Sequence, residues 1–397
     1  MSILHWVWLS MALQPGNPVL DVVLRCFPDP EEFFLSGSAG IDEVGCISGS
    51  EALRIRATSL DLAKEAVERA ENYGAKILCR ADPRFPQKLL DIDCCPAVLY
   101  VLGDENCLNQ MPAVAVVGTR NISDYGKRAA QVIAGGLGAA GALVVSGMAK
   151  GVDSEAHNAC LEAGGKTVAV QGCGICGVYP SDNEELKRRI AANGAVISEF
   201  NPDAEPQSSF FPIRNRIVSG MSLGVCVIEA AARSGTSITA NLALEQGRRV
   251  FAVPADVFRT SSQGTFRLLR EGAVPVSCAE DVLNEFRDEY GQYIDFSKIP
   301  KKQNDRKPRR TKFKTEDFDF DETFPEEKAV PVPKISDLPN MSKEAAALYR
   351  AVDRTPRFAD DLSALSGLNS SETAAALTEL EIYGLIRPVS GRRFVLA

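Results

Sequence analysis

The feature that most constrains the fold is a repeated alternation of short apolar runs and helical patterns between residues 113 and 276. The runs are rich in Val, Ile and Ala, and several are followed closely by glycine. Strands that are apolar on both faces and alternate with helices are typical of a parallel sheet covered by helices on both sides. The expected strands are Ala113–Val117, Ala142–Val145, Thr167–Val170, Ala195–Ile197, Val225–Ile228, Val250–Val253 and Val274–Val276.

Helical patterns fill the intervals between these strands. Their apolar residues recur three or four positions apart, which places them on one side of a helix. The expected helices are Tyr125–Leu137, Ser154–Ala163, Glu184–Ala192, Ile213–Ser219, Ile238–Gln246 and Phe266–Glu271. The sequence therefore predicts an α/β fold built on a parallel sheet.

The region before this alternation is mainly helical. Asp61–Tyr73 has helical spacing, and the apolar run Ile3–Leu13 has no basic leader or small-residue cleavage site, which favours a core helix over a signal peptide. Short strand-like pieces follow at Lys76–Leu78 and Val98–Leu102. We therefore expect a small helical domain over residues 1–75 and the sheet domain over residues 76–287.

The segment 288–342 breaks the alternation. Lys298–Lys314 holds nine basic residues and one acid, and Glu316–Glu327 holds seven acids and no base. Six prolines punctuate the same segment. This composition predicts a mobile charged linker whose two charge blocks partly neutralise each other.

Residues 343–397 predict a compact winged helix, with three short helices and a terminal hairpin around Ser390-Gly391. Winged helices often bind DNA through the third helix. Here the span Ser370–Tyr383 carries Glu372, Glu379 and Glu381 and no Lys or Arg. Because DNA is a polyanion, this charge pattern favours contact with a protein over contact with DNA.

Composition excludes several classes of protein. The net charge is −8, and the middle region 113–287 carries 17 basic and 17 acidic residues, so a polyanion site must come from local clustering. No apolar run reaches the length of a membrane span. The eleven cysteines are mostly isolated, which favours reduced thiols. We expect a cytoplasmic protein with no membrane partner.

Candidate binding residues follow the predicted strands. Ligands of open parallel sheets bind beyond the carboxyl ends of the strands, where Gly118–Arg120, Ser146–Gly151 and Ser234–Thr236 are expected to lie. Glycine-rich turns and helix N-termini offer backbone amides to phosphate. Arg120 and Lys150 add positive charge in the first two loops.

The segment Phe210–Arg216 allows two interpretations. Its two aromatic residues and two arginines could stack on bases and neutralise phosphates. They could also form a helix start in which the aromatic rings are buried and the arginines are salt-bridged. Taken by itself, the segment favours this second interpretation.

Three other motifs are weak. Gly172–Gly177 matches the dinucleotide pattern G-x-G-x-x-G, but Tyr179–Ser181 follows where a helix should begin. Cys173 and Cys176 have no second pair or nearby His, so neither zinc nor redox chemistry is expected. Ser146, Asp153 and His157 could suggest a hydrolase triad, but the G-x-S-x-G turn of a hydrolase is absent, so we expect His157 to be structural. There is also no Walker A sequence, so phosphoryl transfer is not expected.

Taken in order along the chain, these motifs resemble the DprA/Smf family of bacterial DNA-processing proteins. The matching segments include Val117–Arg120, Ser146–Asp153, Phe211–Ile217 and Ser234–Thr239. The resemblance covers residues 80–285 and also fits both flanking domains. It implies an extended Rossmann-like core, with a helical N-terminal domain of the SAM or helix-hairpin-helix kind and a C-terminal winged helix.

The same resemblance implies single-stranded DNA binding without catalysis, and neither a cofactor nor a metal is expected. It implies that the protein is a homodimer and that its partner is a RecA-type recombinase. During natural transformation, the protein would protect incoming DNA and help to load the recombinase on it. The expected DNA contacts are Gly118, Arg120, Ser146, Gly147, Lys150, Lys166, Phe210, Phe211, Arg214, Asn215, Arg216, Ser234, Gly235 and Thr236.

Two other functions stay open. The loop Ser234–Thr236 is similar to the phosphate loop of the cytokinin-activating phosphoribohydrolases, although Ile238 and Thr239 stand where those enzymes carry a Glu. The missing carboxylate argues against hydrolysis. The other possibility is a protein-interaction scaffold in which the winged helix is the working part.

Overall fold

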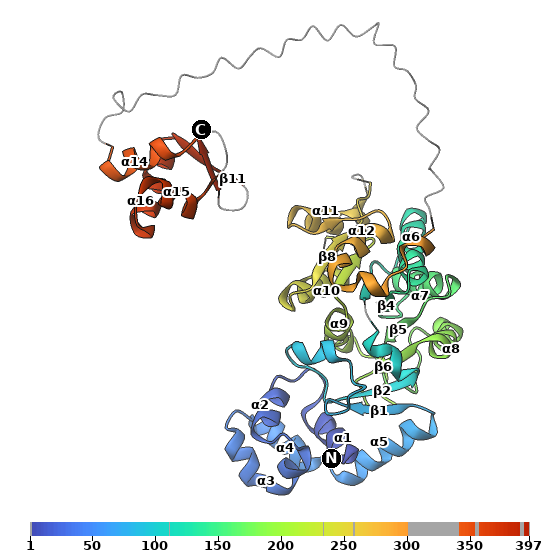
Figure 1. Cartoon of the computed structure of the whole chain (residues 1–397). Coiled ribbons are helices and arrows are strands. Elements are labelled where there is room, and N and C mark those ends of the chain that lie inside the picture. The colour runs from blue at the N-terminus through green and yellow to red at the C-terminus, as the bar shows by residue number, and fades with distance from the viewer. Residues whose placement is uncertain are drawn as a thin grey trace, which may run out of the picture. The chain divides into compact units, whose positions relative to one another are not determined.

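The computed structural model describes residues 2–110, 112–232, 234–256, 259–300, 341–353, 357–389 and 393–396. The chain divides into two compact units, Met1–Asp305 and Arg306–Ala397 (Figure 1). Most of the charged linker expected over 288–342 falls on residues 301–340, outside the described residues. Its first part packs on the first unit, because Ile294 is buried against the sheet's helices and Asp295 N donates to Ala140 O.

The described part of the first unit contains a nine-stranded sheet in the order β1-β2-β6-β5-β4-β3-β7-β8-β9. Strands from β6 to β9 in this order are mutually parallel, whereas β1 and β2 add antiparallel pairs at one edge. The strands are β1 (Lys76–Cys79), β2 (Val98–Gly103), β3 (Ala113–Val117), β4 (Leu143–Ser146), β5 (Thr167–Val170), β6 (Ala195–Ser198), β7 (Gly224–Val227), β8 (Arg249–Ala252) and β9 (Val274–Pro275).

Helices cover both faces of this sheet. They are α6 (Asp124–Ala139), α7 (Val152–Glu162), α8 (Glu184–Asn193), α9 (Phe210–Gly220), α10 (Gly235–Glu245), α11 (Gln263–Arg270), α12 (Ala279–Asn284) and α13 (Arg287–Tyr290). Side chains of β3 alternate between two cores: Ala115 packs with α9, α10 and α11, and Val116 packs with α6, α7 and α12. The structure thus confirms the α/β fold with a Rossmann-like parallel core.

The strand order reverses at β3, and this reversal positions the site. The segments that follow β3 build β4, β5 and β6 to one side, and the later strands β7, β8 and β9 extend to the other side. Crossovers that leave in opposite directions open a crevice beyond the carboxyl ends of the central strands. In this sheet the crevice lies beyond Val117, Ser146 and Val227.

Five N-terminal helices pack on the β1 edge of the sheet. They are α1 (Ile3–Leu13), α2 (Val19–Cys26), α3 (Pro30–Val44), α4 (Gly49–Ala57) and α5 (Leu60–Asn72). As expected, α1 is a core helix: Trp8 is 2% exposed and its indole donates to Thr58 O at 2.8 Å. These helices share one apolar core with β2 and β6, through Tyr100 and Val196.

The second unit is a winged helix, as predicted. Its described elements are α14 (Lys343–Ala351), β10 (Arg357–Phe358), α15 (Ala359–Ser366), α16 (Ser370–Ile382), β11 (Ile386–Val389) and β12 (Arg393–Leu396), with the strands in the order β10-β12-β11. Asn369 caps α16 and forms a reciprocal capping box with Glu372. Leu348, Leu362 and Leu380 are fully buried at the centre of this unit.

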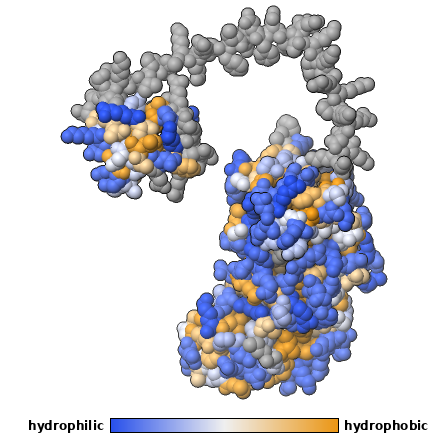
Figure 2. All heavy atoms as spheres, in the orientation of Figure 1, coloured by the Kyte–Doolittle hydropathy of each residue, from blue (hydrophilic) through white to orange (hydrophobic). Residues whose placement is uncertain are grey.

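The length and polarity of the described helices bear on membrane association. None of the helices in the described ranges is long and apolar enough to cross a bilayer. Figure 2 shows hydrophilic and hydrophobic residues mixed on the visible face, with apolar patches over the N-terminal helices, where Leu35 and Leu53 are exposed.

Candidate nucleic-acid interface

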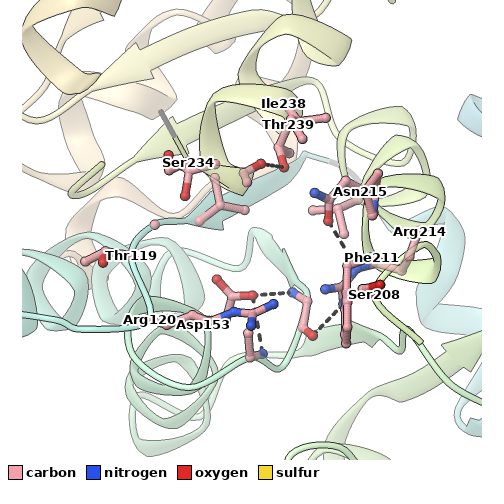
Figure 3. A pocket seen from close by; sticks show the side chains of 18 of the residues that line it. Thr119, Arg120, Asp153, Ser208, Phe211, Arg214, Asn215, Ser234, Ile238 and Thr239 are labelled. Atoms are coloured by element: carbon pink, nitrogen blue, oxygen red, sulfur yellow. Dashed lines mark hydrogen bonds between the residues drawn. The ribbon is translucent and has the colours of Figure 1, made fainter. Parts of the chain in front are cut away.

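A pocket of about 610 Å³ occupies the crevice where the strand order reverses. Figure 3 shows side chains from the loops after β3 and β7, from α9 and from α10 gathered around it. Of the residues predicted from the sequence, the pocket is lined by Gly118, Arg120, Gly147, Phe211, Arg214, Asn215, Ser234, Gly235 and Thr236. The structure therefore brings together the main loops that sequence analysis singled out.

Arg120 is the exposed cation of this pocket. Its guanidinium carbon lies 5.2 Å from the centre of the Phe211 ring, and it forms no ion pair with any described residue. Its loop is anchored at both ends by Glu229: Thr119 N donates to Glu229 O at 2.8 Å, and Ser123 donates from N and Oγ to the carboxylate at 2.9 and 2.7 Å. Arg120 is therefore held in place with its charge available to a ligand.

Two amides of the loop after β4, which the sequence suggested for an anion, already have an acceptor within the protein. Gly147 N and Ala149 N both point to Oδ2 of Asp153, at 3.2 and 3.4 Å. Their amide groups are thus used within the protein. In contrast, Gly235 N and Thr236 N lie in the first turn of α10, where amides have no acceptor within the helix. The amides of this pocket that could meet an anion are therefore those in the first turn of α10.

Arg214 lies beneath the pocket and is 4% exposed. Its Nη1 donates to Gly147 O and Val170 O, and its charge faces Asp153. Burial raises the pKa of Asp153, and the charge of Arg214 opposes that rise. A Cβ at Gly147 would lie 2.5 Å from the Arg214 guanidinium, so a larger residue here would displace that guanidinium. Arg214 braces the loop and presents little surface to a ligand.

Arg216 faces away from the pocket. Its Nη2 contacts both oxygens of Glu199 at 2.6 and 2.7 Å, and the two side chains are 8% and 2% exposed. It lines a separate cavity of about 240 Å³ together with Gly16 and Gln246. Phe210 stacks on Phe200, with ring centres 4.2 Å apart. Arg216 thus matches the salt-bridged interpretation, and Phe210 is half-buried.

Three further predicted residues also lie outside this pocket. The Ser146 hydroxyl donates to Val116 O at 2.6 Å inside the sheet. Lys150 follows β4 but pairs with Asp182 at 2.6 Å. Lys166 precedes β5, so it lies at the amino edge of the sheet, where it bonds Asp104 at 2.9 Å. The expectation that Lys166 lines the same pocket does not agree with this geometry.

Several residues that line the pocket are not among the expected DNA contacts. They are Val117, Thr119, Ala149, Asp153, Tyr179, Pro206, Ser208, Pro212, Val218, Ile238 and Thr239. Helical periodicity could have found Pro212 and Val218, because they fall on the same face of α9 as Phe211 and Asn215. Ile238 and Thr239, which stand where a phosphoribohydrolase needs its Glu, do line the pocket and bring no carboxylate to it.

The weak motifs form no reactive centre among the described residues. Cys173 and Cys176 are free thiols, and no group of His, Cys, Asp and Glu in the described ranges could hold a metal ion. The Ser146 hydroxyl is directed to Val116 O, while His157 Nδ1 lies 2.7 Å from Thr167 Oγ1. Ser146 and His157 therefore do not form the hydrogen bond that a hydrolase triad requires.

His157 predicts a specific pH dependence of stability. Burial lowers the pKa of His157 from 6.5 to about 3, with a smaller contribution from the charge of Arg214. Between these values the unfolded chain binds a proton that the folded protein excludes, so stability falls as the pH falls below 6.5. When the pH falls from 7.5 to about 5.5, the free energy of unfolding should decrease by about 1.4 kcal/mol more for wild type than for His157→Gln. Urea denaturation measures this, and equal losses would contradict it.

A Rossmann-like sheet with a pocket at its strand reversal, on one chain with a winged helix, defines the class of protein: a Rossmann-like domain combined with a winged-helix domain. The sequence profile described as DNA recombination-mediator protein A matches residues 76–287, and the DprA winged helix domain matches residues 332–392. The chain therefore belongs to the DprA/Smf family of DNA recombination-mediator proteins.

Individual relatives agree with this assignment. The chain is 38% identical over 212 residues to the DNA processing protein DprA of Bacillus subtilis. The aligned region covers 53% of this chain and 71% of that protein. It is 30% identical over 347 residues to the protein Smf of Synechocystis, covering 83% of this chain and 82% of that one.

Two solved structures are similar to the fold. DprA from Streptococcus pneumoniae matches with a TM-score of 0.64 and 32% identity, covering 72% of this chain and 98% of that one. DNA processing protein A from Helicobacter pylori matches with a TM-score of 0.50 and 29% identity, covering 55% of this chain and 99% of that one. The report of the Helicobacter structure describes a single-stranded DNA binding mode of that protein.

Proposed function

We propose that this protein is a recombination mediator that binds single-stranded DNA in the pocket beyond β3, β4 and β7, without catalysis. The observation that supports this most strongly is Arg120, an exposed guanidinium at the pocket with no ion pair to a described residue. The adjoining aromatic rings of Phe211 and Tyr179 and the first-turn amides of α10 suit bases and phosphates. The single-stranded DNA binding mode described for the Helicobacter relative agrees with this ligand.

The finer biological role follows from family membership and is also a proposal. The protein would act in the cytoplasm as a homodimer, protect incoming DNA and help load a RecA-type recombinase during natural transformation. Residues 76–287 would bind the strand, with the helical residues 1–75 and the charged linker 288–342 on either side. The winged helix 343–397 would contact a protein, since α16 carries Glu372 and Glu381 and no basic residue.

Fluorescence anisotropy of a labelled poly-dT oligonucleotide tests this proposal. Wild type should bind with strong salt dependence and little sequence preference. Deletion of residues 343–397 should leave the affinity within about twofold, because the pocket lies wholly in the first unit. Absence of binding by folded wild type would refute the proposal, and loss of binding on deletion would assign the strand to the winged helix.

A further inference from the structure

We propose that Tyr179 is the base-stacking side chain of this pocket and that Phe211 supports it from behind. The inference rests on the proposed function, because it names how the same pocket contacts a strand. Tyr179 was not among the residues predicted to bind DNA, and it lines the pocket from the loop between β5 and α8.

The surroundings of the three aromatic residues separate their roles. Phe210 is engaged with the buried ring of Phe200. The ring of Phe211 already contacts Arg120, and it lies against Gly172, where a Cβ would come within 2.8 Å of it. Tyr179 is 39% exposed, and its ring centre lies 5.3 Å from that of Phe211 at 42°. Tyr179 is therefore the aromatic side chain with open surface at this pocket.

The loop that carries Tyr179 is braced on both sides. Two residues earlier, Gly177 O accepts hydrogen bonds from Lys187 Nζ at 2.7 Å and from Gln171 Nε2 at 3.2 Å. Lys187 also donates to Ile175 O and is 2% exposed, so it is fixed beneath the loop. The brace therefore holds the backbone that leads into Tyr179.

The other side of the loop is held by Asn183. Its backbone N donates to Pro180 O at 3.0 Å, and its Nδ2 donates to Met148 O at 2.8 Å and Ser154 Oγ at 2.9 Å. A side chain that is already positioned loses less conformational entropy when it binds. The two anchors thus present the Tyr179 ring in advance of binding.

Tyr179 and Arg120 both contact Phe211, which places a stacking face and a cation within one nucleotide's reach of each other. A base would stack on Tyr179 while a neighbouring phosphate meets Arg120. Every base has a π-face, so stacking of this kind tolerates any sequence. The ligand of the Tyr179 subsite is therefore an unpaired nucleobase of any type.

A comparison of two oligonucleotides tests the inference. Tyr179→Ala should weaken binding of labelled poly-dT about tenfold and binding of an abasic deoxyribose-phosphate oligomer of equal length less than about twofold. Tyr179→Phe keeps the ring and should bind both oligomers as wild type does. Tyr293→Ala is the matched control, because Tyr293 is 59% exposed and lies outside the pocket.

Each result bears on one of the two claims. If wild type binds poly-dT and Tyr179→Ala binds it equally well, or loses both oligomers equally, the stacking inference is overturned and the proposed function stands. If folded wild type binds neither oligomer, the proposed function fails and the inference fails with it.

A fluorescent variant tests stacking independently of whether Tyr179→Ala folds. Trp6 and Trp8 are 3% and 2% exposed in the N-terminal helices, so an indole at position 179 would be the exposed fluorophore of this pocket. The emission of Tyr179→Trp should be quenched by poly-dT and unchanged by the abasic oligomer at saturation. Equal quenching by both would contradict stacking.

Discussion

Arg120→Glu is expected to lower the affinity for poly-dT by about 10- to 100-fold at physiological salt. The wild-type guanidinium is exposed at the pocket and makes no ion pair with a described residue, so its charge is free to meet phosphate. The substitution removes that attraction and adds repulsion. Because one phosphate contact disappears, the slope of log affinity against log salt should become shallower by about 0.7. Anisotropy titrations at several salt concentrations measure both quantities.

The matched control is Arg188→Glu on α8. Arg188 is 68% exposed, pairs with Glu185 at 3.0 Å and lies outside the pocket, and its reversal changes the net charge by the same amount. It should change poly-dT affinity by less than about threefold. Equal losses in the two variants would show that the net charge matters and the pocket does not. Both variants should unfold within about 0.5 kcal/mol of wild type, as is usual for surface positions.

Arg216→Met is expected to lower the free energy of unfolding by about 3–5 kcal/mol. The substitution leaves the Glu199 carboxylate, 3% exposed, without the guanidinium that now contacts both of its oxygens. Burial already raises the pKa of Glu199, and Arg216 is the main group that opposes the rise. Urea denaturation monitored by circular dichroism gives the free energy.

A double variant separates an unpaired charge from lost packing. Glu199→Leu combined with Arg216→Met removes both charges, and it should recover most of the stability lost by Arg216→Met alone. Below its unfolding transition, Arg216→Met should bind poly-dT within about threefold of wild type, since Arg216 does not line the pocket. A stability loss below about 1 kcal/mol, or a specific loss of DNA binding, would contradict this role for Arg216.

The sheet could be predicted from sequence because its signal is local. Ala113–Val117 and Thr167–Val170 are short apolar runs with turns on both sides, and each forms a strand with the expected bounds. Because the strands of a parallel sheet run in one direction, their carboxyl ends meet at the same edge, where ligands bind. The loops at Arg120 and Ser234 could therefore be placed at one pocket without any knowledge of side-chain contacts.

The arginines of α9 show why the rest could not be predicted in the same way. Arg214 and Arg216 were considered together because they are close in sequence. Residues two apart on a helix are rotated by about 200°, so they face opposite sides. One consequently lies under the pocket and the other reaches Glu199. Helical periodicity holds this information, but the burial of both side chains depends on what packs around the helix.

Lys166 and Tyr179 illustrate two other limits. Lys166 immediately precedes β5, and this position alone places it at the amino edge of the sheet. The prediction that it contacts DNA came from the family resemblance instead. Tyr179 lies in the irregular stretch between β5 and α8, and its position depends on Lys187 and Asn183. No periodic pattern encodes such long-range hydrogen bonds, so Tyr179 could be found only from the structure.

The central claim is that a single strand binds at the carboxyl edge of the sheet in the first unit. Photo-crosslinking of a 5-iodouracil-substituted poly-dT oligonucleotide, followed by mass spectrometry of the full chain, tests it most directly. The account predicts crosslinks in peptides that contain Tyr179 and Phe211, and their loss in the Arg120→Glu variant. Crosslinks confined to residues 343–397 or to the N-terminal helices would contradict it.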